Sequence, residues 1–370
     1  MFIRKIGVIG RTYRHLNRYR QILAILFKYG FGDLVDTLKI EQYLEIGLKM
    51  ISRKRREHVE KLTRAERVRM ALEELGPTFV KLGQILSTRP DLIPMELTQE
   101  LSRLQDHVLP FPYAEVKHII ESELGVPLGD IFQHLDETPL AAASIGQVHR
   151  ARLMNDEEVV IKVQRPGIHK TIDVDLEIML HLASLMERHL EEAELHRPTK
   201  IVEEFAHTLE RELDYTVEAS HVERFASQFM GDQNIYVPKV YRETTTTRVL
   251  TMEYVDGIKA SEVDRLQLAS LDQKEIARRG AELIMKQIFV HGFFHADPHP
   301  GNIYILPNNV ICYLDFGKGG HWIIEFSLRG CWGPYNDLFT TLPLDGYHGV
   351  FDIKPCLRIN LEISKECHKF

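Results

Sequence analysis

The sequence has few of the features that mark secreted, cysteine-metal or membrane-spanning proteins. Its 370 residues include four cysteines, none of them in a Cys-x-x-Cys pair. This argues against a disulfide framework or a cysteine zinc site and favours a reducing compartment. No apolar run approaches the ~20 residues of a spanning helix. The longest run near the start, Ile22 to Phe27, is also too short for a signal peptide. We therefore expect an intracellular protein that crosses no bilayer by itself.

The net charge of the chain and its distribution bear on which partners the protein can bind. The net charge of −7 and the pI of about 6.2 argue against a nucleic-acid partner. The first 32 residues nevertheless hold seven Lys/Arg and no acid, and a second basic group stands at 53–56. Such a segment either lies on an anionic membrane surface or packs on its own domain. Both interpretations stay open, because the apolar positions form no single stripe.

The strongest motif is Phe294-His-Ala-Asp-Pro-His-Pro-Gly-Asn302, followed by Tyr313-Leu-Asp-Phe-Gly317. Asp297 and Asn302 follow an apolar helical pattern, and Asp315 ends a predicted hairpin of strands 303–306 and 310–314. Phosphoryl transfer needs a carboxylate near the attacking group and hard oxygen ligands for Mg²⁺. The spacing resembles the kinase catalytic loop and its D-F-G. We predict Asp297 as base or water-positioner, and Asn302 and Asp315 as magnesium ligands.

Two other interpretations of this loop compete with the kinase one. The polar residues could simply cap local structure. Alternatively, the His-x-Asp-x-His pattern of His295, Asp297 and His299 could ligate zinc. The zinc interpretation is disfavoured because it leaves Asn302 and Asp315 without a role.

A strand lysine upstream completes the expected nucleotide site. Val159-Val-Ile-Lys162 resembles the kinase strand whose lysine holds the α- and β-phosphates. A desolvated lysine needs a carboxylate partner. Three candidates, Glu212, Asp214 and Glu218, lie on a helix predicted over Ile201–Met230. Glu212 and Glu218 are six residues apart and cannot share one narrow face, so one of them meets Lys162 and the other something else.

The hinge and the phosphate loop complete the nucleotide-binding set. Leu250–Gly257 resembles a hinge that binds adenine through its backbone, near Glu253 and Val255. Taken alone, the segment could equally be an ordinary strand followed by a turn. An alanine-rich loop stands where kinases have a glycine-rich one. Its nucleotide-binding candidates are Ala141, Ala142, Ala143, Ser144, Ile145 and Gly146. Alanine adopts φ > 0 only at a cost, so we expect a stiffer loop than a glycine-rich one. Ala296 replaces the arginine of H-R-D, and no A-P-E follows, so control by an activation-loop phosphate is not expected.

These departures together resemble the UbiB/AarF family of atypical kinase-like proteins, which is related to the ADCK kinases of mitochondria and plastids. The resemblance covers about residues 20–317. Its markers are Lys81-Leu-Gly-Gln84, the loop 141–147, Glu212-Leu-Asp214 and His295 to Asn302. It implies an α+β, bilobal protein-kinase-like fold with an N-terminal helical extension. It also implies that the helix of Lys81, Gly83 and Gln84 packs over the active site, anchored by Glu212 and Asp214, and that Glu218 pairs with Lys162.

The resemblance also implies a function. It points to an atypical kinase or ATPase that uses ATP/ADP and Mg²⁺ and supports ubiquinone biosynthesis. The implied partners are the nucleotide, a membrane surface or quinone lipid, and quinone-biosynthesis proteins. The implied location is cytoplasmic and peripheral to the inner face of the membrane. Lys81 over the cleft would favour ATP hydrolysis or a small or lipid-borne acceptor over a protein substrate. A small-molecule kinase of the aminoglycoside or choline type, and a non-catalytic lipid-binding scaffold or inactive fragment, remain alternatives.

We divide the chain into four parts. They are the helical extension (1–110), the N-lobe with a helical insertion (111–257), a partial C-lobe (258–317) and an atypical tail (318–370). The family resemblance ends at Gly317. The sequence of the tail does not resemble the family, which is what a shifted reading frame or a disrupted gene would produce. If the rest of the C-lobe is missing, apolar surface near the catalytic loop should be exposed.

Overall fold

The computed structural model describes residues 13–38, 62–104, 109–190, 197–295, 300–316 and 319–321. All of them belong to one compact unit, Met1–Ile323. Their buried apolar side chains form three large cores. One lies among helices, one under a five-stranded sheet and one around a four-stranded sheet. This arrangement confirms the predicted α+β class.

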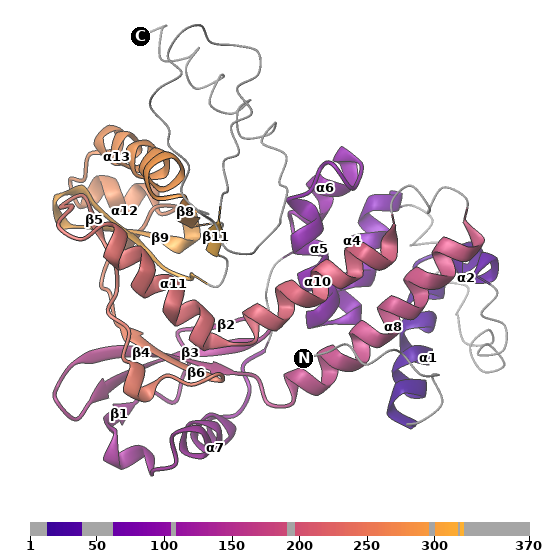
Figure 1. Ribbon diagram of the computed structural model, residues 1–370, viewed down its shortest axis with the longest axis horizontal. Coiled ribbons are helices and arrows are strands. Elements are labelled where there is room, and N and C mark those ends of the chain that lie inside the picture. The colour runs from indigo at the N-terminus through magenta and orange to yellow at the C-terminus, as the bar shows by residue number, and fades with distance from the viewer. Residues whose placement is uncertain are drawn as a thin grey trace, which may run out of the picture. The chain divides into compact units, whose positions relative to one another are not determined.

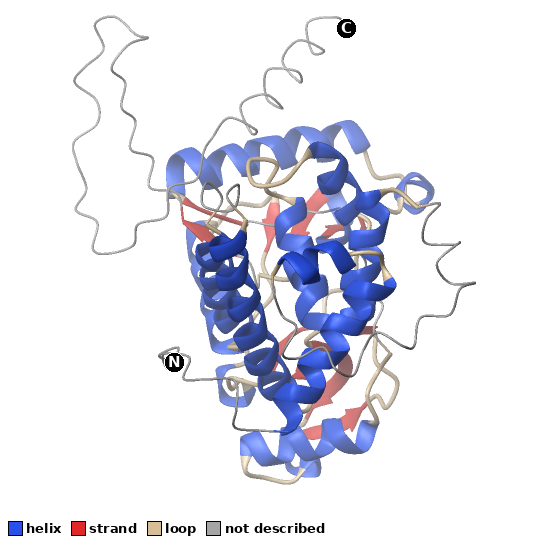
Figure 2. Ribbon diagram, turned by 90° about the vertical axis from the view of Figure 1, so that its right-hand side faces the viewer, coloured by secondary structure: helices blue, strands red, loops and turns tan. Residues whose placement is uncertain are grey.

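The helical core joins the N-terminal extension to the predicted insertion. Its elements are α1 (Tyr13–Lys28), α2 (Gly32–Thr37), α4 (Arg64–Leu75), α5 (Pro77–Ser87), α8 (Ile168–His189) and α10 (Pro198–Glu212), with α6 (Met95–Leu101) packed beside α4 and α5. Figure 1 shows α8 and α10 running alongside each other. Figure 2 brings these helices to the front, with the strands behind them. The insertion therefore packs against the extension, which lies far from it in sequence.

Local signals in the sequence set the ends of α4 and α5. Thr63 and Glu66 form a capping box, as Thr63-Arg-Ala-Glu66 predicts. Gly76, at φ 100°, ends α4, and Pro77 opens α5. An L-residue is strained at that φ, which explains why a glycine stands at this break.

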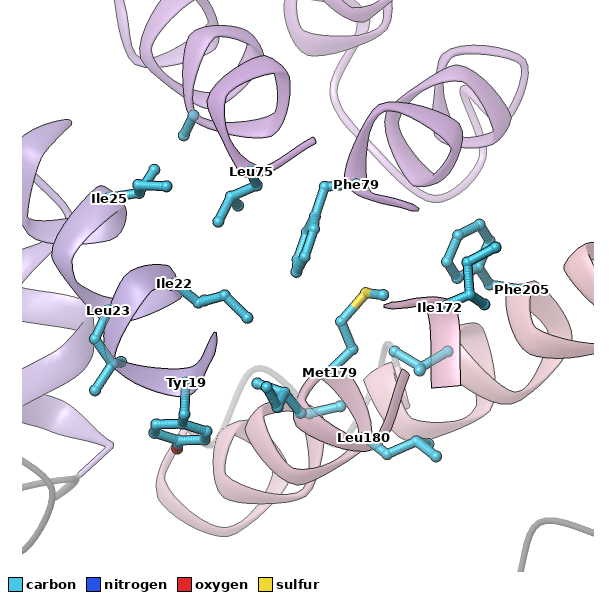
Figure 3. Packing of buried hydrophobic residues seen from close by; sticks show 14 of the residues in the cluster. Tyr19, Ile22, Leu23, Ile25, Leu75, Phe79, Ile172, Met179, Leu180 and Phe205 are labelled. Carbon is cyan, nitrogen blue, oxygen red and sulfur yellow. The ribbon is translucent and has the colours of Figure 1, made fainter. Parts of the chain in front are cut away.

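The N-terminal helix contributes its apolar side to the helical core. Tyr19, Ile22, Leu23 and Ile25 are buried against Phe79 and other core side chains (Figure 3). The described part of the basic segment therefore packs on its own domain, which was one of the two interpretations. The basic residues before position 13 and those at 53–56 lie outside the described residues.

One arginine of α1 connects three helices. Its guanidinium donates to both carboxylate oxygens of the buried Asp175 on α8, at 2.6 and 3.0 Å. It also donates to the Leu75 carbonyl at the end of α4, at 2.6 Å, and lies over the Phe79 ring. This residue, Arg18, fixes the position of the break between α4 and α5. It thereby orients the helix that carries Lys81.

The five-stranded antiparallel sheet forms the small lobe. Its strands are β1 (Phe132–Leu135), β2 (Ala141–Ala142), β3 (Gly146–Leu153), β4 (Glu158–Gln164) and β6 (Val249–Glu253), in the order β1-β3-β4-β6 with β2 beside β3. Helix α7 (Tyr113–Leu124) packs on this sheet and ends at Gly125 in the left-handed conformation. The alternation of 148–153 and 159–163 predicts two strands joined by a polar turn at 155–158, and the pattern of 113–124 predicts an amphipathic helix. Strands β3 and β4 and helix α7 confirm these elements.

The core around the four-stranded sheet surrounds the hairpin of β9 and β10. The four-stranded sheet has the order β5 (Ile235–Tyr236), β10 (Val310–Tyr313), β9 (Ile303–Leu306), β7 (Ile258–Lys259). Helices α11 (Tyr215–Gln228), α12 (Val263–Leu268) and α13 (Gln273–Lys286) lie around it. A π-helical turn, η4 (Gln287–His291), leads from α13 to β8 (Phe293–His295), which pairs with β11 (Gly319–His321). The short 3-10 turns are η2 (Leu128–Asp130), η3 (Arg242–Thr244), η5 (Pro300–Asn302) and η6 (Pro307–Asn309).

Three predicted elements differ from the structure. The single helix expected over Ile201–Met230 is two helices, because Asp214 is extended and caps α11. The pattern of Gln273–Val290 predicts one long helix, but the chain is α-helical only to Lys286. The residues Tyr236–Tyr241 predict a strand, but the structure has only the two-residue β5 and one bridge at Val240. In each case helical or alternating polarity continues across a change of backbone that periodicity does not reveal.

Among the described helices, none has the length and apolarity that a membrane crossing requires. Apolar side chains are nevertheless exposed at the end of α13 and in η4. Phe289 is 56% exposed and Val290 72%, and Ile284 and Met285 are exposed beside them.

We predict that Arg18→Met lowers the free energy of unfolding by about 3–5 kcal/mol, because it leaves the Asp175 carboxylate buried without its cation. The measurement is a urea unfolding midpoint. The control is Lys28→Met on the same helix, whose exposed pair with Glu74 should contribute about 0–1 kcal/mol. Equal effects of the two substitutions would contradict the role assigned to Arg18.

Candidate nucleotide and metal site

The centre of the site is one lysine between two carboxylates. Strand β4 presents Lys162, whose Nζ lies 2.9 Å from Glu218 Oε2 on α11 and 3.4 Å from Asp315 Oδ1. The expected pairing of Lys162 with Glu218 is confirmed. Burial would lower the pKa of Lys162, but the carboxylates of Asp315 and Glu218 outweigh burial and raise it well above its usual value. Lys162 therefore stays a cation.

The hairpin of β9 and β10 brings the two predicted magnesium ligands to one end. Ile303 pairs with Tyr313, and the Leu314 amide donates to the Asn302 carbonyl at 2.8 Å. Asn302 and Asp315 therefore flank the last paired positions, although thirteen residues separate them. Both offer hard oxygen atoms, which are the ligands Mg²⁺ prefers. In donor chemistry the pair fits the ion.

Asp315 has an unusual backbone. Its φ is 59°, which costs an L-residue roughly 1 kcal/mol or more unless its neighbours hold it there. Its side chain is 56% exposed, whereas the next residue, Phe316, is 1% exposed. The buried phenylalanine therefore anchors the segment while the carboxylate turns outward toward Lys162.

The predicted catalytic base cannot be placed, because 296–299, with Asp297 and His299, lie outside the described residues. The base role remains a prediction. The preceding residue, His295, is buried: its amide donates to Gln287 Oε1 and its Nε2 lies 3.1 Å from the Leu314 carbonyl. His295 thus ties the start of the loop to the Asp315 segment. Two residues of the zinc alternative are among those not described, so it is not tested.

A cluster of three rings in tilted and edge-to-face contact joins α11 to the segment of Asp315 and Phe316. The Phe316 ring lies 5.0 Å from the His295 ring and 5.0 Å from the Phe225 ring. Phe225 was not singled out from the sequence. Its signal is its spacing of seven residues from Glu218, which places both on one face of α11.

The alanine-rich loop forms a short hairpin and not an open phosphate loop. Ala141 and Ala142 pair with β3, and the Ala143 amide donates to the Gly146 carbonyl at 2.8 Å. No residue from 141 to 146 has a positive φ, so the expected cost of alanine in that conformation does not arise. The hydroxyl of Ser144 is buried, with no hydrogen-bond partner among the described residues. An unused donor in this loop fits a phosphate oxygen.

Gly146 is needed for space. A Cβ there would lie 2.5 Å from the Tyr215 hydroxyl and 2.6 Å from the Val163 carbonyl oxygen. Tyr215 is fully buried, and burial raises the pKa of its hydroxyl, so the ring stays neutral beside Lys162. The close approach of α11 to β3 and β4 therefore depends on this glycine.

Helix α5 carries the Lys-x-Gly-Gln motif. Lys81 Nζ lies 3.2 Å from Glu212 Oε2 at the end of α10, and both side chains are largely buried. Gln84 donates to the Leu104 carbonyl at 3.4 Å. A Cβ on Gly83 would lie 2.3 Å from Leu104 Cδ1, so this glycine allows close packing. The implied anchoring by Glu212 is confirmed.

The implied role of Asp214 is wrong. Its carboxylate accepts from the Thr216 amide at 2.9 Å and from the Thr216 hydroxyl at 2.6 Å, which makes it the N-cap of α11. It therefore acts on the helix that carries Glu218 and not on the Lys81 helix.

The hinge follows the last strand of the small lobe. Glu253 ends β6 opposite Val159, and its carboxylate accepts from the Tyr236 hydroxyl at 2.6 Å and from the Lys239 amide at 3.1 Å. The side chain of Glu253 thus braces the strand before the hinge. Adenine binding by the backbone near Glu253 and Val255 remains a prediction.

We predict that Gly146→Ala lowers the free energy of unfolding by about 1–3 kcal/mol, because the new methyl meets a backbone oxygen that cannot move away cheaply. Adding Tyr215→Phe should recover only part of the loss, since the Val163 oxygen remains. Gly129→Ala in the same lobe, where a Cβ meets nothing within 4 Å, is the control. Thermal unfolding of the variants measures all three effects. Full recovery in the double variant would contradict the clash with the backbone.

Comparison with known proteins places this geometry in a family. A profile of the ABC1 atypical kinase-like domain matches residues 103–328, which extends eleven residues past Gly317. The Cellvibrio japonicus protein named "Probable protein kinase UbiB" is 44% identical over 245 residues, 66% of this chain and 44% of that protein. The Arabidopsis thaliana chloroplast protein ACTIVITY OF BC1 COMPLEX KINASE 8 is 43% identical over 284 residues, 76% of this chain and 36% of that one.

A solved structure agrees with these relatives. The complex of Rv3197 with erythromycin from Mycobacterium tuberculosis matches with a TM-score of 0.52 and 28% identity, over 72% of this chain and 66% of that one. This chain spans less than half the length of the two named relatives. The sequence resemblance, the kinase-like fold and the profile agree. The chain belongs to the ABC1 atypical kinase-like family, which includes proteins named UbiB.

Proposed function

We propose that this chain binds a magnesium–nucleotide complex and acts on it as an atypical kinase or ATPase. The observation that carries the proposal is the position of Lys162 between Glu218 and Asp315. A buried cation held by one carboxylate, with a second carboxylate exposed beside it, is suited to receive a phosphate and a metal ion together.

Each residue of the site has a physical role in this proposal. The cation of Lys162 meets phosphate oxygens, and Glu218 holds that cation in place. Asn302 and Asp315 would hold Mg²⁺, which when bound offsets the negative charge of the phosphates. The Ser144 hydroxyl, which is buried without a partner among the described residues, adds a hydrogen-bond donor in the alanine-rich loop. Asp297 would orient the attacking group.

The Lys81 helix supports a restriction on the acceptor. Its partner Glu212 stands three residues before Tyr215, the first residue of α11, which is the helix that carries Glu218. A helix anchored there would leave little room for a peptide, so ATP hydrolysis or transfer to a small or lipid-borne group is favoured. Together with relatives named UbiB, this supports a role in ubiquinone biosynthesis at a membrane surface, with quinone-biosynthesis proteins as partners.

A second candidate function is phosphorylation of a soluble small molecule. One observation favours it: the solved neighbour is a complex with the macrolide erythromycin. The two functions differ in their products. Inorganic phosphate formed from Mg-ATP indicates hydrolysis, whereas a phosphorylated alcohol or aminoglycoside indicates a small-molecule kinase. Choline, an aminoglycoside and erythromycin are the acceptors to supply.

We predict that Mg-ADP and Mg-ATP raise the melting temperature of the wild type, because a ligand that binds only the folded state stabilises it. Asp315→Asn removes a charged metal ligand and should weaken Mg-dependent nucleotide affinity about tenfold or more. The measurement is a thermal-shift titration with nucleotide at several Mg²⁺ concentrations.

The matched control is Asp264→Asn, which changes an exposed carboxylate on α12. It should bind like the wild type. Unchanged affinity in Asp315→Asn would reject the proposed metal site. No response of the wild type to either nucleotide would favour a non-catalytic scaffold or an inactive fragment.

A further inference from the structure

Helix α11 contacts the segment of Asp315 and Phe316 through His221, a residue to which the proposed function assigns no role. The ring of His221 lies 5.5 Å from the Phe293 ring of β8, and its Nδ1 lies 3.0 Å from the Phe316 carbonyl. A carbonyl can only accept, so Nδ1 carries the hydrogen and donates it. His221 is thus in contact with both the strand that enters the catalytic loop and the residue after Asp315.

The spacing on α11 places this contact beside the lysine partner. Glu218, His221 and Phe225 stand at i, i+3 and i+7, which is one face of a helix. Glu218 holds Lys162, His221 holds the Phe316 carbonyl and Phe225 packs on the Phe316 ring. One helix face therefore sets the position of the cation and of the loop together.

The segment around Asp315 needs to be held in position because of its backbone conformation. Asp315 has a φ of 59°, a conformation that an L-residue keeps only when its surroundings enforce it. On one side, the Leu314 amide donates to Asn302, and the Leu314 carbonyl meets His295. On the other side, the Phe316 carbonyl meets His221.

We propose that His221 is a positioning residue for Asp315. Its Nδ1 hydrogen bond fixes the Phe316 carbonyl and so keeps Asp315 in the conformation that places its carboxylate 3.4 Å from Lys162. The proposal deepens the proposed function, because it assigns to α11 the orientation of a magnesium ligand. His221 acts through Asp315 and does not touch the nucleotide in this role.

Two substitutions separate the hydrogen bond from the rest of the side chain. In His221→Asn, the amide nitrogen is bonded to Cγ, as Nδ1 is, so it can donate to the same carbonyl. His221→Leu keeps apolar contact with Phe293 but has no donor. If the hydrogen bond matters, Asn should behave like the wild type and Leu should not. If only packing matters, Leu should be the milder change.

The first measurement is amide hydrogen exchange without nucleotide. Exchange of the segment 313–316 should be about fivefold faster in His221→Leu, the factor expected for one lost hydrogen bond, and near the wild-type rate in His221→Asn. Exchange in β3 and β4 should not change. Unchanged exchange at 313–316 in the Leu variant overturns the proposal, as does an equal rise throughout α11 and the loop.

The second measurement is the Mg²⁺ concentration that gives half of the nucleotide-induced rise in melting temperature. It should be about fivefold higher in His221→Leu and restored in His221→Asn. Faster exchange with an unchanged Mg²⁺ requirement overturns the assignment to Asp315. If Mg-nucleotide does not change the melting temperature of the wild type, the proposed function is overturned instead. Hydrogen exchange alone then decides whether His221 holds the segment 313–316.

Discussion

The structure of the site depends on one buried cation that has to be kept charged. Lys162 comes from the middle of a fully hydrogen-bonded sheet, where desolvation opposes its charge. Two carboxylates from distant parts of the chain reverse that preference. Each must be delivered within hydrogen-bond or ion-pair distance. The position of α11 beside the small lobe and the position of the hairpin that ends at Asp315 both follow from this requirement.

The break at Asp214 makes the delivery of Glu218 compatible with the anchoring of Lys81. On one continuous helix, Glu212 and Glu218 would face in different directions around a single axis. The extended residue between α10 and α11 instead lets each helix take its own direction. Glu212 then meets Lys81, and Glu218 meets Lys162. The cap formed by Asp214 stabilises the start of α11, so one short segment serves both ion pairs.

In the helical domain, too, a buried ion pair holds elements in position. Arg18 and Asp175 connect α1 and α8, and the guanidinium also holds the end of α4, just before α5 begins. Because removing Arg18 would leave the Asp175 carboxylate buried without its cation, this contact fixes the start of the Lys81 helix firmly. The basic, apolar N-terminal helix thus has a structural role in its described part, whatever the residues before it bind.

The sequence by itself determined which residues to propose for the site and where most of its elements lie. Motif spacing singled out Lys162, Asn302 and Asp315, and alternation and caps located β3, β4, α4 and α7, because these signals are local. It could not locate the break at Asp214 or the closed form of the alanine-rich loop. Helical periodicity runs across the break, and the loop's conformation depends on pairing with β3 and on Tyr215 against Gly146.

Only the tertiary structure decided which acid meets which lysine, and that α8 and α10 pack with the N-terminal helices. It also brought out His221 and Phe225. Such choices depend on contacts between segments far apart in the chain, and one sequence carries no direct signal of those contacts.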